Sequence, residues 1–202
     1  SIDMADPDAG SAAQETSSSP KAPFMLAVLL GVLSAAGPLS TDMYLPSLPT
    51  ISAVFGADVG QTQLTLSAFL IGFAVGQLFV GPMADRYGRR PILIAGFTLY
   101  VVASVASLFV FSIEGLIGAR FVQAMGASAG AAVTRAVVRD LFAPQQAARM
   151  LSHMGTIMGF VPAAAPIAGG AILVAFGWRA NFVAMTIFGV LSILVTLTML
   201  KE

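Results

Sequence analysis

The sequence predicts an all-α membrane protein with six transmembrane helices, arranged as two inverted sets of three. Of the 202 residues, 57% are hydrophobic and only 10% are charged, whereas about a quarter of the residues of a soluble domain are charged. The apolar residues gather in six runs, and each run reaches the roughly 20 residues that cross a bilayer. The charges, glycine pairs and uniformly apolar stretches of the first three runs recur in the same order in the last three.

Residues 1–22 precede the first apolar run, and we expect them to form a disordered tail because Ser, Ala, Asp and Pro dominate there. The tail lacks the basic start of a cleaved signal peptide. Residues 23–202 are expected to form one six-helix transmembrane domain. Its predicted helices are about Phe24–Tyr44, Gln61–Met83, Pro91–Phe111, Ile113–Arg135, Met150–Phe176 and Ala180–Leu200.

The six predicted helices differ in a way that repeats. The first and fourth each hold a charge within the span, Asp42 and Arg120, while the third and sixth are almost uniformly apolar and suit lipid contact. The second and fifth carry glycines four residues apart, which let another helix approach closely. These glycines are Gly72 and Gly76, and then Gly155 and Gly159. Because three is odd, the second set is inverted relative to the first, the pattern of half a secondary transporter.

Basic residues predict the orientation of the helices, since cytoplasmic loops are enriched in Lys and Arg. If the helices alternate in direction, all but one of the basic residues outside the spans share one side. Those on that side are Lys21, Arg86, Arg89, Arg90, Arg135, Arg139, Arg149 and Lys201, and Arg179 is the exception. Both termini and the links before Pro91 and Met150 are therefore expected to be cytoplasmic.

Asp42 and Arg120 are the charges that need an explanation, because a charge within the bilayer costs at least ~2.5 kcal/mol. At a rise of roughly 1.5 Å per residue, both lie in the outer third of the membrane. We expect them to face one cavity, with Gln123 on the same helix face as Arg120. One interpretation is a proton site at Asp42. The alternatives are a structural pair between two helices, or an interfacial Asp42 beside Tyr44 at the helix exit.

Two further stretches combine unusual residues. Asp85 lies at the C-terminal end of a helix, where the helix dipole is already negative. It therefore needs a positive partner, and Arg86, Arg89, Arg90 or the N-terminus of another helix could supply one. The fifth helix contains Pro162, Pro166 and the pair Gly169–Gly170, so a kinked, smooth-faced helix is expected, for close packing or for gating.

Composition also excludes several functions. With no cysteine and a single histidine, thiolate and histidine-rich metal sites are excluded. Zero net charge and scattered basic residues argue against a nucleic-acid partner. No nucleophile–base pair or phosphate-cradling loop supports an enzyme, and no cofactor is expected.

Several motifs together resemble one family. The spacing Gly81-x-x-x-Asp85-Arg86-x-Gly88-Arg89-Arg90 resembles the signature of the major facilitator superfamily between its second and third helices. The run Arg120-Phe-Val-Gln123-Ala-Met-Gly126 is similar to its fourth-helix motif. The fifth-helix residues resemble its antiporter motif, with Ala165 in place of the first glycine. Ser40–Pro49, with Gly177-Trp178-Arg179, resembles drug:proton antiporters of the Bcr/CflA type.

The resemblance implies the N-terminal six-helix half of a twelve-helix transporter in a bacterial inner (plasma) membrane. It implies multidrug efflux and antibiotic resistance by alternating access, driven by the proton gradient. The residues implied in proton and substrate coupling are Asp42, Tyr44, Arg120 and Gln123. Those implied in cytoplasmic gating are Gly81, Asp85, Arg86, Gly88, Arg89 and Arg90. The antiporter motif would comprise Gly159, Pro162, Pro166, Gly169 and Gly170.

The resemblance also implies partners: a small-molecule drug, the lipid bilayer, and a C-terminal six-helix half or a second copy of the chain. Two alternatives stay open at this point. The chain could belong to a metabolite exporter of the same superfamily. It could also be a half-size membrane module that self-associates and does not transport alone.

Overall fold

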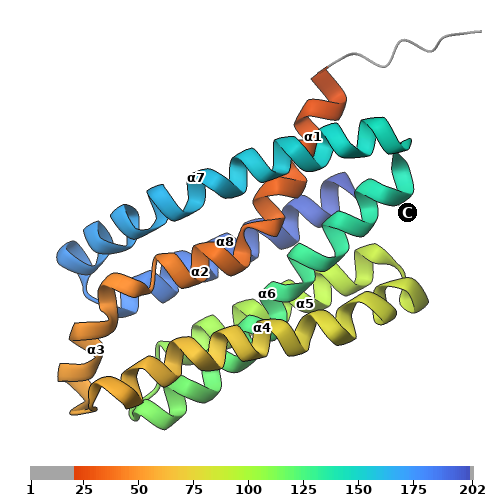
Figure 1. Cartoon of the computed structure of the whole chain (residues 1–202). Coiled ribbons are helices and arrows are strands. Elements are labelled where there is room, and N and C mark those ends of the chain that lie inside the picture. The colour runs from red at the N-terminus through yellow and green to blue at the C-terminus, as the bar shows by residue number, and fades with distance from the viewer. Residues whose placement is uncertain (1–20, 201–202) are drawn as a thin grey trace, which may run out of the picture.

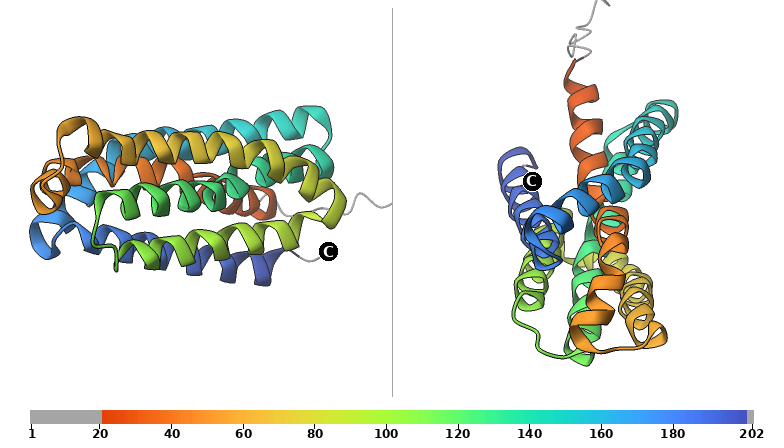
Figure 2. Two further views of the ribbon diagram at one scale, coloured as in Figure 1. Left: turned by 90° about the horizontal axis from the view of Figure 1, so that it is seen from below. Right: turned by 90° about the vertical axis from the view of Figure 1, so that its left-hand side faces the viewer.

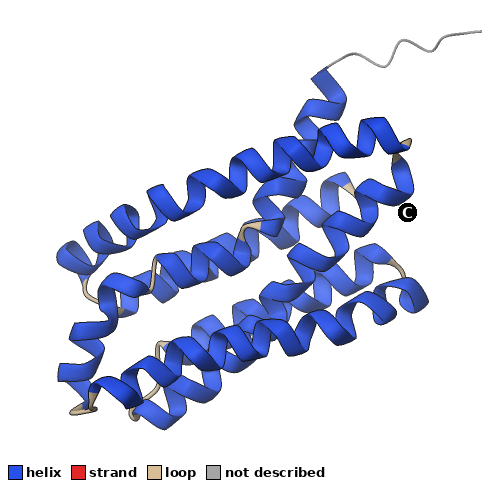
Figure 3. Cartoon of the chain, in the orientation of Figure 1, coloured by secondary structure: helices blue, strands red, loops and turns tan. Residues whose placement is uncertain are grey.

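The computed structural model describes residues 21–200, and these residues form helices joined by short links (Figure 3). The disordered tail was expected at residues 1–22, and residues 1–20 lie outside the described part of the chain. Residues 21 and 22 belong to helix α1 instead, which begins at Lys21. The elements are α1 (Lys21–Ser34), α2 (Ala36–Asp42), a 3-10 turn η1 (Leu45–Ser47), α3 (Leu48–Phe55), α4 (Val59–Tyr87), α5 (Arg89–Ser107), α6 (Ile113–Leu141), α7 (Pro144–Phe176) and α8 (Arg179–Met199).

The described residues contain five or six segments of membrane-spanning length, and six when one bent pair counts as a single span. Five helices, α4 to α8, are long and apolar enough to span a bilayer, and the bent pair formed by α1 and residues 36–55 makes the sixth. The helices run alongside one another as an elongated bundle (Figure 1). Links before α5 and α7 lie at one end with most of the arginines, and we call this the arginine-rich end.

The first span is bent by 48°, although the sequence predicted a single helix from Phe24 to Tyr44. Helix α1 ends at Ser34, four residues before Pro38. Proline has no N–H to donate to the carbonyl of Ser34, and its ring crowds that carbonyl, so the ladder of hydrogen bonds breaks there. The span then continues beyond the predicted end through η1 and α3, which stops at Gly56 with a φ of 60°.

Helix α6 forms the centre of the bundle, packed along α4 on one side and α5 on the other. Sixty-one per cent of its apolar span is buried, against 11% for α7. Its small residues explain this, because Gly126 lies against the backbone of Tyr100 and Gly130 against the backbone of Leu33. A Cβ atom at either glycine would meet main-chain atoms that cannot move aside, so these helices could not approach so closely.

The glycine pairs predicted to allow close helix packing behave differently in the two helices. Gly72 of α4 lies against the backbone of Phe121, and Gly76 against Ser128 and Met125 of α6. The prediction is therefore confirmed for α4. Around Gly155 and Gly159 of α7, no atom of the described residues lies within 4 Å of an added Cβ. The prediction for α7 is wrong within this part of the chain, because that face of the helix meets no neighbour.

This difference predicts opposite outcomes for two matched substitutions. Gly72→Leu is expected to lower the free energy of unfolding of the chain by roughly 1–3 kcal/mol, because its side chain would push α4 away from α6. Gly155→Leu places the same side chain in open space and is expected to change it by less than about 0.5 kcal/mol. Denaturant unfolding of the purified chain in detergent measures both. Equal losses would mean that leucine disturbs the helices themselves rather than their packing.

Candidate functional site

The buried guanidinium of Arg120 is the most unusual feature of the bundle interior. Arg120 lies on α6, two turns after the helix start, where Ser112 accepts a hydrogen bond from the N–H of Gly115 (3.1 Å). Its side chain is fully buried, the largest in the described chain to be so. A charge in this position needs compensation from its surroundings.

Hydrogen bonds and aromatic rings supply that compensation. Arg120 Nη1 donates to Gln123 Oε1 (2.8 Å) and Nη2 donates to the Ser40 carbonyl (3.2 Å). The guanidinium carbon lies 4.1 Å from the ring centre of Tyr44 and 4.2 Å from that of Phe69. Desolvated cation–π contacts stabilise by about 2 kcal/mol or more each. Arg120 therefore joins α6 to α2 and α4 without an ion pair, and its Nε has no acceptor among residues 21–200.

Asp42 forms no ion pair with Arg120, so the alternative of a structural pair between two helices is wrong. The ion pairs within the described part of the chain all involve Arg89. The reason is the rotation of α2: Ser40 and Tyr44 lie one turn apart on the face toward Arg120. Asp42 lies about 200° around the helix from Ser40, on the opposite side. Its side chain is partly exposed. This turn therefore contacts the shielded cation of Arg120 on its inner side and leaves the Asp42 carboxylate accessible on the other side.

A set of buried hydroxyl and amide groups surrounds Arg120. Gln123 Nε2 donates to Ser104 Oγ (2.8 Å), and the hydroxyls of Ser40 and Tyr100 share a hydrogen bond of 2.6 Å. The Tyr44 hydroxyl bonds to Thr65 of α4. Sequence reasoning found Tyr44 and Gln123 and missed Ser40, Ser104 and Tyr100 as polar partners. Tyr100 and Ser104 could have been recognised in the sequence, because they are polar residues inside the apolar span of α5.

The arginine-rich end holds a second cluster. Arg89 Nη1 lies 2.7 Å from Asp85 Oδ1, and Arg89 Nη2 lies 2.9 Å from Asp140 Oδ2, so one guanidinium bridges two acids. The predicted partner of Asp85 is thus found in the link itself. Gly88, with a φ of 97°, makes the reversal from α4 to α5 that brings Arg89 back to Asp85. Asp140, at the end of α6, was not predicted.

The other two arginines of the link do not join this cluster. Arg86 packs over the ring of Tyr87, 5.3 Å from its centre. Arg90 Nη2 donates to the carbonyl of Leu197 on α8 (3.1 Å). Arg89 and Arg90 have different partners because successive residues at the start of α5 point in directions about 100° apart.

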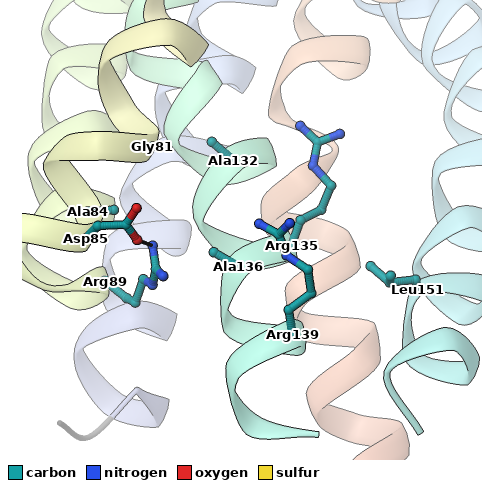
Figure 4. Close-up of a pocket in the computed structure, with 9 residues that line it drawn as sticks. All are labelled: Gly81, Ala84, Asp85, Arg89, Ala132, Arg135, Ala136, Arg139 and Leu151. Carbon is teal, nitrogen blue, oxygen red and sulfur yellow. Dashed lines mark ion pairs between the residues drawn. The ribbon is translucent and has the colours of Figure 1, made fainter. Parts of the chain in front are cut away.

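A cavity of about 390 Å³ adjoins the Arg89 cluster (Figure 4). Figure 4 shows Asp85 and Arg89 at one wall and Arg135 and Arg139 of α6 at another. Its remaining lining residues are Gly81, Ala84, Ala132, Ala136 and Leu151. The cavity is thus a basic pocket between the end of α4, the start of α5, the end of α6 and the start of α7.

Removing the acid of this cluster gives a prediction for Asp85→Ala. Asp85 is 67% exposed, and an exposed ion pair contributes about 0–1 kcal/mol. The free energy of unfolding of the isolated chain is therefore expected to fall by less than about 1 kcal/mol. Misfolding of the isolated chain would instead make the Asp85–Arg89 pair a folding requirement.

The predicted motif of α7 is spread along one continuous helix, which passes through Pro162 and Pro166 without a break. Gly169 is buried against the backbone of Met43, so it brings α7 onto the end of the first span. Asn181 of α8 fixes this junction by donating to the Gly169 carbonyl (3.2 Å) and to Ser47 (3.0 Å). Gly159 and Pro162 are exposed instead, and Gly170 only approaches Pro46. The motif therefore does not form one site within the described residues.

Comparisons with known proteins add to this geometry. Residues 22–202 match the family model described as Major Facilitator Superfamily. A chloramphenicol resistance protein of Pseudomonas aeruginosa is 38% identical over 77% of this chain and 37% of its own length. A bicyclomycin resistance protein homolog of Haemophilus influenzae is 34% identical over 85% of this chain and 43% of its own length. The chain thus spans less than half the length of these curated relatives.

One solved structure resembles the whole bundle. The proton:xylose symporter XylE matches with a TM-score of 0.77, covering 89% of this chain and 45% of that one. Its sequence is only 14% identical, so this likeness shows the fold and carries nothing on substrate.

Proposed function

The chain belongs to the Major Facilitator Superfamily, and we propose that it is the N-terminal half of a proton-coupled drug exporter working by alternating access. The family consists of transporters, and relatives of this chain are named for resistance to chloramphenicol and bicyclomycin. Those names support small antibacterial drugs as the substrate class. The chain would cross a bacterial inner membrane with its arginine-rich end and both termini in the cytoplasm, as the basic residues predict.

The observation that carries proton coupling is the accessible carboxylate of Asp42 in a broken apolar span, beside a shielded cation. Arg120 holds the Ser40 carbonyl and the Tyr44 ring, which fixes the rotation of α2. That rotation leaves Asp42 partly exposed on the other face. A neutral carboxyl tolerates an apolar surrounding far better than a carboxylate does. Protonation of Asp42 would therefore favour a closed arrangement around α2, and proton loss would favour a state open to water or drug.

The proposed missing half would cover a surface that this chain leaves open. Figure 2 shows α4 and α7 along one side of the bundle and α5 and α8 along the other. On the first side, both helices expose large apolar side chains, and Gly155 and Gly159 of α7 meet no neighbour among the described residues. These side chains include Leu70, Leu78 and Phe79 on α4, and Phe160, Ile167 and Val174 on α7. Glycines four apart are typical of helix–helix contact, so α7 is suited to a partner helix.

Subunit mass in detergent tests this proposal, with the chain alone and with a co-expressed C-terminal half of a homologous exporter. We expect a complex of the two halves that moves drug in vesicles, and a chain that moves none by itself. Leucine at both Gly155 and Gly159 is expected to block the complex and leave the lone chain folded. If two identical chains formed a stable pair that exports drug, the partner would be a second copy of the chain and not a C-terminal half. Competition by one metabolite, with no response to apolar drugs, would assign a metabolite exporter instead.

A further inference from the structure

A groove between α5 and α8 at the arginine-rich end lies apart from the Arg120 site and from the Asp85–Arg89 cluster. It measures about 410 Å³ and is lined by Arg90, Pro91, Ile94, Ala95 and Leu197. Four of these five side chains are apolar, and the fifth is an arginine. The groove is therefore a hydrophobic channel with a single positive charge at its end, where α5 begins.

Arg90 is positioned but not satisfied. Its Nη2 donates to the Leu197 carbonyl (3.1 Å), which holds the guanidinium across the gap between the two helices. Its Nε is buried and has no hydrogen-bond acceptor in the described structure. Neighbouring Arg89 differs, because Asp85 and Asp140 occupy its donors. The Arg90 guanidinium is thus held in place while its Nη1 group makes no hydrogen bond among residues 21–200, and phosphate suits such a planar group.

The surroundings of the groove are suited to lipid. Beyond it, exposed apolar side chains continue along both helices toward the middle of the span. They are Leu99 and Val102 on α5, and Leu191 and Leu194 on α8. This side of the bundle is the one opposite to α4 and α7 (Figure 2). An arginine at the end of a membrane helix, above an apolar groove, matches a phospholipid with its phosphate at the surface and its chain in the bilayer.

We propose that this groove binds a phospholipid of the adjacent leaflet, with the phosphate on Arg90 and one acyl chain along Pro91, Ile94 and Ala95. The lipid phosphate would accept hydrogen bonds from the Nη1 group of Arg90, which makes no hydrogen bond among residues 21–200. The acyl chain would cover apolar surface on both helices. Bound in this way, the lipid would join the start of α5 to the end of α8. Lipid binding in this groove does not depend on proton coupling or on a second six-helix half.

Native mass spectrometry of the purified chain in detergent tests the site with three probes. They are phosphatidylglycerol, diacylglycerol with the same acyl chains, and water-soluble glycerol 3-phosphate. Phosphatidylglycerol is expected to bind most tightly. Arg90→Gln should weaken it about tenfold, the loss expected for one charge-assisted hydrogen bond, and should not change diacylglycerol binding. Ala95→Phe fills the groove and keeps the charge, so it should also weaken phosphatidylglycerol.

Matched variants control for charge and for folding. Arg139→Gln removes an arginine at the same end that lines the other pocket, and it should leave phosphatidylglycerol binding unchanged. Glu202→Gln should also leave it unchanged if lipid, and not the side-chain carboxylate of Glu202, serves Arg90. Unfolding midpoints close to that of the unmodified chain confirm intact folds. Equal phosphatidylglycerol binding by Arg90→Gln would overturn the proposal. The proposal would also be overturned if glycerol 3-phosphate bound as tightly as phosphatidylglycerol and its binding were unchanged in Ala95→Phe. That result would assign a simple anion site.

Discussion

Replacing Arg120 with alanine is expected to abolish export and to destabilise the chain. The substitution empties a fully buried position and leaves the Ser40 carbonyl and Gln123 without their donor. A large-to-small change in a core costs about 2–5 kcal/mol, and a buried polar group left without a partner costs about 1–3 kcal/mol more. The gain from no longer burying a charge opposes these terms. We expect a net loss of roughly 3 kcal/mol, measured by denaturant unfolding in detergent.

Two further variants separate the structural and functional roles of Arg120. Arg120→Met fills the space without a charge and is expected to recover much of the stability, because apolar replacements of buried charges are often neutral. It should still export no drug. Arg120→Lys keeps the charge but not the planar group that bonds Gln123 and Ser40 and stacks on two rings, so export should stay far below that of the unmodified protein. Arg135→Ala, an exposed arginine on the same helix, is the control. Full export by Arg120→Met would leave Arg120 a purely structural role.

Asp42→Asn is expected to remove proton-coupled export and to leave the fold intact. The substitution keeps the shape of the side chain but cannot gain or lose a proton. Asp42 makes no side-chain hydrogen bond or ion pair among residues 21–200, so the unfolding midpoint should hardly move. Drug uptake driven by an imposed pH gradient should fall to the background of empty vesicles, while drug binding persists.

The matched control for Asp42 is Asp58→Asn. Asp58 is an acid near the same end of the bundle and caps α4 by accepting from the N–H of Gln61 (2.7 Å). Asparagine caps helices about as well as aspartate, so both fold and export should be unchanged. Equal loss of export in both variants would point to surface charge at this end rather than to a proton site at Asp42.

The sequence was sufficient for the membrane spans and for some of their contacts. Twenty apolar residues have few alternatives in a bilayer. Glycines four apart predicted that another helix packs closely on α4, and in the structure that helix is α6. The break at Ala35 was also predictable, because Pro38 cannot donate to the Ser34 carbonyl. Helix α3 was missed because it follows the span as a short segment between Pro46 and Gly56.

The polar site was harder to predict than the helices. Whether Asp42 or Ser40 faces Arg120 depends on the rotation of α2 about its axis, and the kinked start of that helix changes its direction. Arg89 and Asp140 are 51 residues apart, so their contact depends on where α6 ends beside α5. Sequence patterns define which residues share a helix face. They do not define which face of one helix meets which face of the next.

Drug-driven proton movement in sealed vesicles tests most directly whether this chain is the proton-coupling half of an exporter. The vesicles would contain the chain with a second six-helix half and a pH-sensitive dye inside. An outward drug gradient is expected to drive protons the opposite way, in amounts that saturate with drug concentration and vanish in Asp42→Asn. Drug movement without any proton movement, or proton movement that persists in Asp42→Asn, would contradict proton coupling through this half.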